Sequence, residues 1–175
     1  MNIRKIILSL ILLTVSLHST AQSVLGIPFG SSYDEVKQAL IKRHVGDNMW
    51  EQDGRIVVTN GYIGNIPFGL GTFYFQFKEN KSYLSAASFS DVELTAIQAK
   101  KKRDEFSAVI KDKYSGSITE YIDGSGFKLY EFGKNPLNEE KPLGKIFIFH
   151  NKNGNKYDPV LYYGPINYVE PNPDF

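Results

Sequence analysis

Apolar residues recur at helical spacing in two segments of the chain, and each segment begins with a capping signal. Residues 32–35 read Ser-Tyr-Asp-Glu, a capping box in which the serine and the glutamate satisfy backbone donors reciprocally. An apolar stripe follows and stops before Gly46, a residue type common at helix ends. Residues 90–93 read Ser-Asp-Val-Glu and predict the start of a second helix, which ends at Gly116. The two stripes consist of Val36, Ala39 and Leu40, and of Ile97, Phe106, Val109, Ile110 and Tyr114.

The segments that follow each predicted helix have the composition and turn signals of antiparallel strands. Asp53 and Gly54 form a dipeptide that strongly favours a two-residue hairpin turn. Longer connections containing Gly and Pro are expected at residues 61–71 and 133–144. The predicted strands cover residues 49–52, 55–60, 72–78, 83–89, 117–122, 127–132, 145–150 and 157–163.

Two similar units are predicted, because several residues recur at an offset of 70 positions. Asp34, Glu35, Gly46, Asp53 and Gly54 all reappear at this offset in the second unit. We therefore expect an α+β fold in which two helices pack on antiparallel sheet, as a tandem helix-plus-four-strand repeat within one compact body. The units are residues 22–90 and 91–163, and residues 164–175 form an extended tail containing Pro. The alternative is that two capped helices followed by hairpins share such residues without a common origin.

The N-terminus has the three parts of an export signal. Arg4 and Lys5 are basic, residues 6–15 are almost all apolar, and residues 19–21 read Ser-Thr-Ala, which suits cleavage after residue 21. An apolar stretch of about ten residues is half of a membrane span. We therefore expect residues 1–21 to be a signal peptide, and the product to be soluble in the periplasm or outside the cell.

Composition excludes several classes of function. The chain has 175 residues, of which 42% are hydrophobic and 14% aromatic, so it is too apolar to be disordered. It contains no cysteine, which excludes disulfides, thiolate metal sites and a thiol nucleophile. A formal charge of +1 argues against nucleic-acid binding. No second apolar stretch is long enough to span a membrane.

Residues that carry chemistry are few in the predicted mature chain. His44 and His150 are its two histidines, and sequence spacing does not reveal the nucleophile and the orienting acid that a catalytic histidine needs. The consecutive acids at 34–35 and 104–105 suit helix starts, and neighbouring residues on a helix point apart. Residues 151–155 read Asn-Lys-Asn-Gly-Asn, which favours a turn over a calcium loop because carboxylates are absent. We expect no catalytic residue, no metal and no cofactor.

Aromatic residues are the most unusual feature of the predicted strands. Phe73, Phe75 and Phe77 alternate along one strand, so they would face the helices and leave Tyr74 on the opposite side. Tyrosine and tryptophan offer a large contact area with a polar group, as a platform for a protein partner or a glycan requires. The alternative is a second core layer made of cross-strand aromatic pairs. The candidate binding residues are Trp50, Tyr74, Tyr121 and Tyr130.

The layout resembles that of two known families. An exported chain with two helix-plus-four-strand units is similar to the beta-lactamase inhibitory proteins. A single unit resembles the small outer-membrane assembly lipoproteins, whose helices also open with a small residue and acids, as residues 30–46 do here. Both families act by binding proteins, although the disulfides of the first and the acylated cysteine of the second are absent from this chain. The resemblance implies an interaction module and carries over no functional residue.

The leading hypothesis is an exported, non-enzymatic protein-interaction module of a bacterial envelope that acts through an aromatic sheet face. The first alternative is a module that binds a small ligand or a glycan. A hydrolase is the third hypothesis, and it would require His150 or a pair of carboxylates to converge in a cleft.

Overall fold

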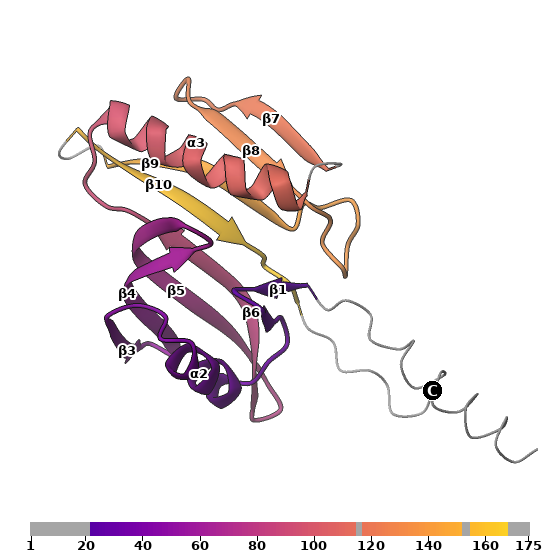
Figure 1. Ribbon diagram of the computed structural model, residues 1–175. Helices are drawn as coiled ribbons and strands as arrows, with labels where there is room; N and C mark the ends of the chain where they lie inside the picture. Colours follow the sequence, from indigo (N-terminus) through magenta and orange to yellow (C-terminus); the bar gives the residue numbers. More distant parts are fainter. Residues whose placement is uncertain (1–21, 115–116, 152–154, 168–175) are drawn as a thin grey trace, which may run out of the picture.

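One antiparallel sheet of eight strands forms the body of the protein (Figure 1). The computed structural model describes residues 22–114, 117–151 and 155–167. The predicted signal peptide and the end of the predicted tail, residues 168–175, lie outside the described residues. In spatial order the strands are β3 (Asn48–Gln52), β4 (Arg55–Ile63), β5 (Ile66–Lys78), β6 (Lys81–Ser90), β10 (Lys156–Tyr163), β9 (Gly144–Asn151), β8 (Lys128–Phe132) and β7 (Ile118–Ile122).

The first helix, α2 (Tyr33–Lys42), begins where the sequence predicts it. Ser32 is the N-cap, and its hydroxyl accepts a hydrogen bond from the backbone N–H of Glu35. The Glu35 carboxylate accepts in turn from the backbone N–H of Ser32 at 2.8 Å, which completes the capping box. Val36 and Leu40 are buried against the sheet, as the apolar stripe predicts.

The second helix, α3 (Ala96–Lys113), begins later than the sequence predicts. Its N-cap is Thr95, which forms a capping box with Gln98. The predicted helix cap at residues 90–93 is wrong, because Ser90 is the last residue of β6. The Asp91 carboxylate does not cap the helix but accepts a hydrogen bond from the backbone N–H of Gly69 at 2.6 Å. Residues 90–93 and residues 95–98 both carry a capping signal. The first segment cannot begin the helix because Ser90 is paired within the sheet.

The hairpin of β4 and β5 extends further than predicted. The sequence predicts a connection at residues 61–71, but the two strands remain paired until Ile63 meets Ile66. Glycine is required there for packing, since a Cβ on Gly61 would lie 2.3 Å from the ring of Phe68. Phe68 is buried to 2% exposure in the space that the glycine leaves. Glycine here marks a close approach inside a strand and not a break.

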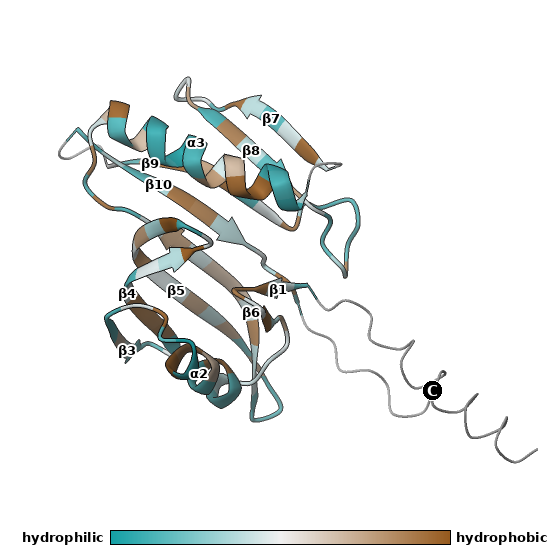
Figure 2. Ribbon diagram, in the orientation of Figure 1, coloured by the Kyte–Doolittle hydropathy of each residue, from teal (hydrophilic) through white to brown (hydrophobic). Residues whose placement is uncertain are grey.

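Both helices pack on the same face of the sheet, which is therefore the covered face (Figure 1). The side chains of Val36 on α2 and of Phe106 on α3 belong to one apolar cluster. The central strands carry apolar segments, whereas α3 is largely hydrophilic on its outer side (Figure 2). One row of paired residues on the covered face runs through Val58, Gly71, Phe89, Leu161, Ile146 and Tyr130.

The order of elements is the same in the two halves of the chain. Helix α2 is followed by β3 to β6 and helix α3 by β7 to β10, and the last strands of the two halves, β6 and β10, pair at the centre of the sheet. A short ribbon of β1 (Ser23–Val24) and β2 (Ile27–Pro28) precedes α2. The predicted α+β class, with helices on antiparallel sheet, is confirmed. None of the helices in the described part of the chain has the length and apolar character needed to cross a membrane.

Candidate functional site

The face of the sheet opposite α2 and α3, here called the uncovered face, carries no helix among the described residues. A single row of paired residues crosses this face through all eight strands. Neighbouring strands lie about 4.8 Å apart, so the row is on the order of 34 Å long. It consists of Trp50, Val57, Thr72, Ser88, Tyr162, Lys145, Glu131 and Thr119.

Trp50 and Tyr74, two of the predicted binding residues, lie together on the uncovered face. They line a depression of about 200 Å³, together with Arg55 and Thr72 among others. The guanidinium of Arg55 lies over the Tyr74 ring, 5.2 Å from its centroid. Among the described residues Arg55 forms no ion pair, so its charge is available to a ligand or a partner. The depression thus combines one indole, one phenol and one cation.

Tyr74 also connects the depression to the centre of the sheet. Its hydroxyl lies 3.2 Å from the Ser88 hydroxyl, and its ring centroid lies 6.5 Å from that of Tyr162. Partial burial, and secondarily the nearby Tyr74, raises the pKa of Tyr162. The Tyr162 hydroxyl therefore stays protonated at neutral pH and can donate a hydrogen bond to a partner.

Aromatic side chains continue across the second half of the uncovered face. Phe149 is 57% exposed on β9, and Tyr121 is 48% exposed on the edge strand β7. Phe149 alternates in phase with Lys145, which places it on the same side as Tyr162. Trp50, on the other edge strand, is 41% exposed. The exposed aromatic residues are thus spread over the width of the sheet instead of converging on one point.

The expectation that Tyr130 belongs to an exposed binding face with Tyr74 is wrong. Tyr130 pairs with Ile146 on the covered face and is 5% exposed. Two cations of α3 contact its ring: the guanidinium of Arg103 lies 5.9 Å and the ammonium of Lys111 lies 5.2 Å from the centroid. Alternation within β8 shows which residues share a face, but it does not show which face the helix covers.

The predicted row of phenylalanines lies on the covered face, but only part of the row is buried. Phe73 is fully buried, and the Phe75 ring packs 4.8 Å from the ring of Tyr33 on α2. Phe77 is 65% exposed because it lies at the end of β5, beyond the residues that α2 covers.

Sequence reasoning missed Arg55, Phe149 and Tyr162. The signal for Tyr162 is the alternation along β10, in which Leu161 and Tyr163 are buried and Tyr162 between them is half-buried. The signal for Arg55 is its position directly after the predicted turn at Asp53 and Gly54. It is the first residue of β4, the strand next to β5, which carries Tyr74. No pattern in the sequence shows that these two residues are neighbours, because the pairing of β4 with β5 determines it.

The histidines and acids lie away from this face or serve local structure. His44 is exposed just after α2, with a positive φ of 50°. The His150 ring stacks on Tyr157 with centroids 4.5 Å apart, and no hydrogen bond or ion pair joins it to a carboxylate within the described residues. Asp104 pairs with the buried Arg103 at 2.7 Å. The described part of the chain contains no group of three His, Asp or Glu side chains that could hold a metal ion.

The geometry of the uncovered face therefore allows broad contact, and two of its cations, Arg55 and Lys78, form no ion pair with any described residue. No protein-family model matches the chain, and comparisons with curated proteins and with solved structures find no significant match.

Proposed function

We propose that the protein is an exported, non-enzymatic module that binds another protein through the uncovered face of its sheet. The observation that carries this proposal is the spread of exposed aromatic side chains from Trp50 on one edge strand to Tyr121 on the other. A small molecule contacts only part of such a row, whereas a protein interface of ordinary size buries about 800 Å² on each partner. Aromatic residues and arginine are also the types that contribute most to protein–protein binding.

The charges of the uncovered face support a partner that carries acidic groups. The Lys145 ammonium lies 2.7 Å from the Glu131 carboxylate, so these two charges compensate each other. Arg55 adds a positive charge next to Tyr74, and Lys78 adds another on the same side of β5 as Tyr74. A partner with apolar side chains and with acidic groups opposite Arg55 and Lys78 would complement this arrangement.

We further propose that the two halves of the sheet arose by duplication of one helix-plus-four-strand unit. The shared order of elements supports this origin, as does the burial of Val36 and Leu40 on α2 and of Phe106 and Ile110 on α3, which correspond at the offset of 70 residues. The two-unit layout is also the one on which the resemblance to the beta-lactamase inhibitory proteins rests, and that resemblance stays a prediction.

The test is co-purification with the tagged, secreted protein from the organism's own envelope fraction. We expect a specific partner to be retained by the wild type and lost from the variants Trp50→Ser and Phe149→Ser. The matched control is Ile97→Ser, which removes an equally apolar side chain that is 82% exposed on α3. Retention of the partner by both face variants, or equal loss in the control variant, would contradict the proposal.

Glycan binding is a second candidate function, because the depression between Trp50 and Tyr74 combines aromatic rings with polar groups. Trp50 is the only tryptophan of the chain, so its fluorescence reports directly on this depression. A saturable change in Trp50 emission during titration with chito-oligosaccharides, abolished in Tyr74→Ala, would favour this function over protein binding. Unchanged emission would exclude it for that class of glycan.

A further inference from the structure

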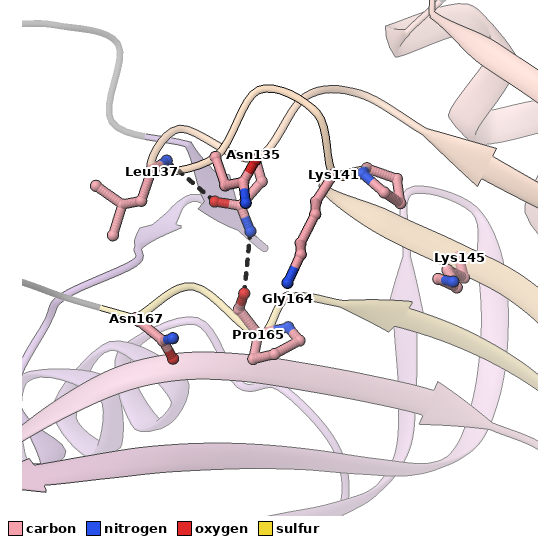
Figure 3. Close-up of a pocket in the computed structure, with 9 residues that line it drawn as sticks. Asn135, Leu137, Lys141, Lys145, Gly164, Pro165 and Asn167 are labelled. Atoms are coloured by element: carbon pink, nitrogen blue, oxygen red, sulfur yellow. Dashed lines mark hydrogen bonds between the residues drawn. The ribbon is translucent and has the colours of Figure 1, made fainter.

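A second hollow, of about 600 Å³, has Lys145 of the uncovered face in its lining but none of the exposed aromatic residues of that face (Figure 3). Its walls come from the connection between β8 and β9, from β9 itself and from the segment that follows β10. A volume of this size is typical of pockets that hold small ligands. The hollow was not anticipated from the sequence, because its walls meet only when β9 pairs with β10.

The walls of the hollow are held in place by hydrogen bonds. Asn135 is 6% exposed, and its amide nitrogen donates to the carbonyl oxygen of Pro165 at 3.0 Å (Figure 3). Its amide oxygen accepts from the backbone N–H of Leu137 at 3.0 Å. The backbone N–H of Gly164 donates to the Leu143 carbonyl oxygen at 2.7 Å. These bonds join the two walls, so a ligand would enter a preformed site.

The charged groups that the described residues contribute to the lining are all positive. These are Lys141 and Lys145, and no carboxylate of the described part of the chain lines the hollow. Lys145 is compensated by Glu131, which stands outside the lining. The Lys141 side chain extends across the hollow toward Gly164 (Figure 3), and it forms no ion pair with any described residue. An unpaired ammonium in a concave site attracts an anion more strongly than one on a convex surface.

The remaining lining groups combine amides with apolar surface. Asn138 and Asn167 supply amide groups that can donate hydrogen bonds to an anionic oxygen. Leu137, Pro142 and Pro165 supply apolar walls, and the Leu137 side chain is 53% exposed. A ligand that fits this lining carries both an anionic group and an apolar group.

We propose that this hollow binds a carboxylate-bearing ligand with an adjacent apolar group, with Lys141 as the residue that pairs with the carboxylate. The site does not depend on the proposed function of the uncovered face. The carboxylate has two possible sources, a separate molecule or the acids Glu170 and Asp174 of this chain, which follow Asn167 by a few residues in the sequence.

The test uses N-acetyl-phenylalanine as the probe and its neutral amide, N-acetyl-phenylalaninamide, as the matched control. Both are titrated into the ¹⁵N-labelled protein, and amide shifts are followed at Gly164 and Lys145. We expect saturable shifts with the acid and none with the amide. Lys141→Gln should weaken binding about tenfold, the loss of one charge-assisted hydrogen bond. Lys42→Gln, in the exposed last turn of α2, should leave binding unchanged.

The full-length variant Glu170→Gln/Asp174→Asn distinguishes the two sources. A severalfold gain in probe affinity in this variant identifies the chain's own acids as competitors for the hollow, and unchanged affinity identifies a separate ligand. Equal shifts with the acid and the amide, or probe binding that Lys141→Gln leaves unaltered, would overturn the proposal. So would the lack of saturable shifts in both the wild type and the double variant.

Discussion

Two tyrosines with the same alternating sequence context lie on opposite faces of the sheet, and their replacement by alanine should have very different costs. Tyr130 is 5% exposed between the sheet and α3, where it contacts Arg103 and Lys111. Removal of a buried aromatic ring costs about 3–5 kcal/mol of unfolding free energy. Tyr130→Ala therefore removes a large part of the stability expected of a domain of this size.

The cost at Tyr74 should be much smaller. Its ring is half-buried on the uncovered face, and the variant Tyr74→Ala loses the contact with the Arg55 guanidinium and the hydroxyl pair with Ser88. Each of these partly buried interactions is worth about 0.5–1 kcal/mol. We expect a total loss of about 1–2 kcal/mol.

Urea unfolding followed by circular dichroism measures both values. With a slope of about 2 kcal/mol per molar urea, the midpoint should fall by about 1.5–2.5 M for Tyr130→Ala and by less than about 1 M for Tyr74→Ala. Tyr130→Phe is the control, since it keeps the ring and should cost less than about 1 kcal/mol. Equal shifts for the two alanine variants, or a larger shift for Tyr74→Ala, would refute the assignment of the faces.

Three further outcomes are expected. Thr95→Ala removes the N-cap of α3 and should cost about 1 kcal/mol, read from the urea midpoint; no loss would place the start of α3 elsewhere. Gly71→Ala places a Cβ 2.9 Å from the ring of Phe68 and should cost about 1–3 kcal/mol, measured as a lower melting temperature, whereas an unchanged value would contradict the packing. Burial, then a hydrogen bond to Glu51, raises the pKa of Tyr33 to about 12. Because Tyr33 ionises more readily in the unfolded chain, stability should fall as pH rises from about 10 to 12, and the stability of Tyr33→Phe should fall less over that range; identical profiles would contradict this.

The local signals in the sequence predict most of the elements but not their faces or their limits. Sequence pattern alone locates the capping box at residues 32–35 and the turn at Asp53 and Gly54, because all of the interactions that define each of them lie within a few residues. The start of α3 was misplaced because the choice between two capping signals depends on whether Ser90 pairs with a distant strand. Such long-range pairing leaves no local trace.

The candidate site was predictable to the same limited extent. Trp50 and Tyr74 were identified from residue type and strand alternation, and they line one depression. Tyr130 shares that residue type and alternation, but it is buried because α3 crosses β8 on its side of the sheet. Which side of each strand a helix covers depends on how the two halves of the chain join at β6 and β10. This pairing is visible only in the three-dimensional structure.

Site-specific photo-crosslinking in cells that produce the protein tests the central proposal most directly. A photoreactive phenylalanine analogue is placed singly at Trp50, Phe149 and Tyr121 on the uncovered face, and at Ile41 and Ile97, exposed positions on the two helices. The account predicts that the same partner is captured from positions on both halves of the uncovered face and from neither helix. Capture from the helix positions alone, with none from the uncovered face, would contradict it.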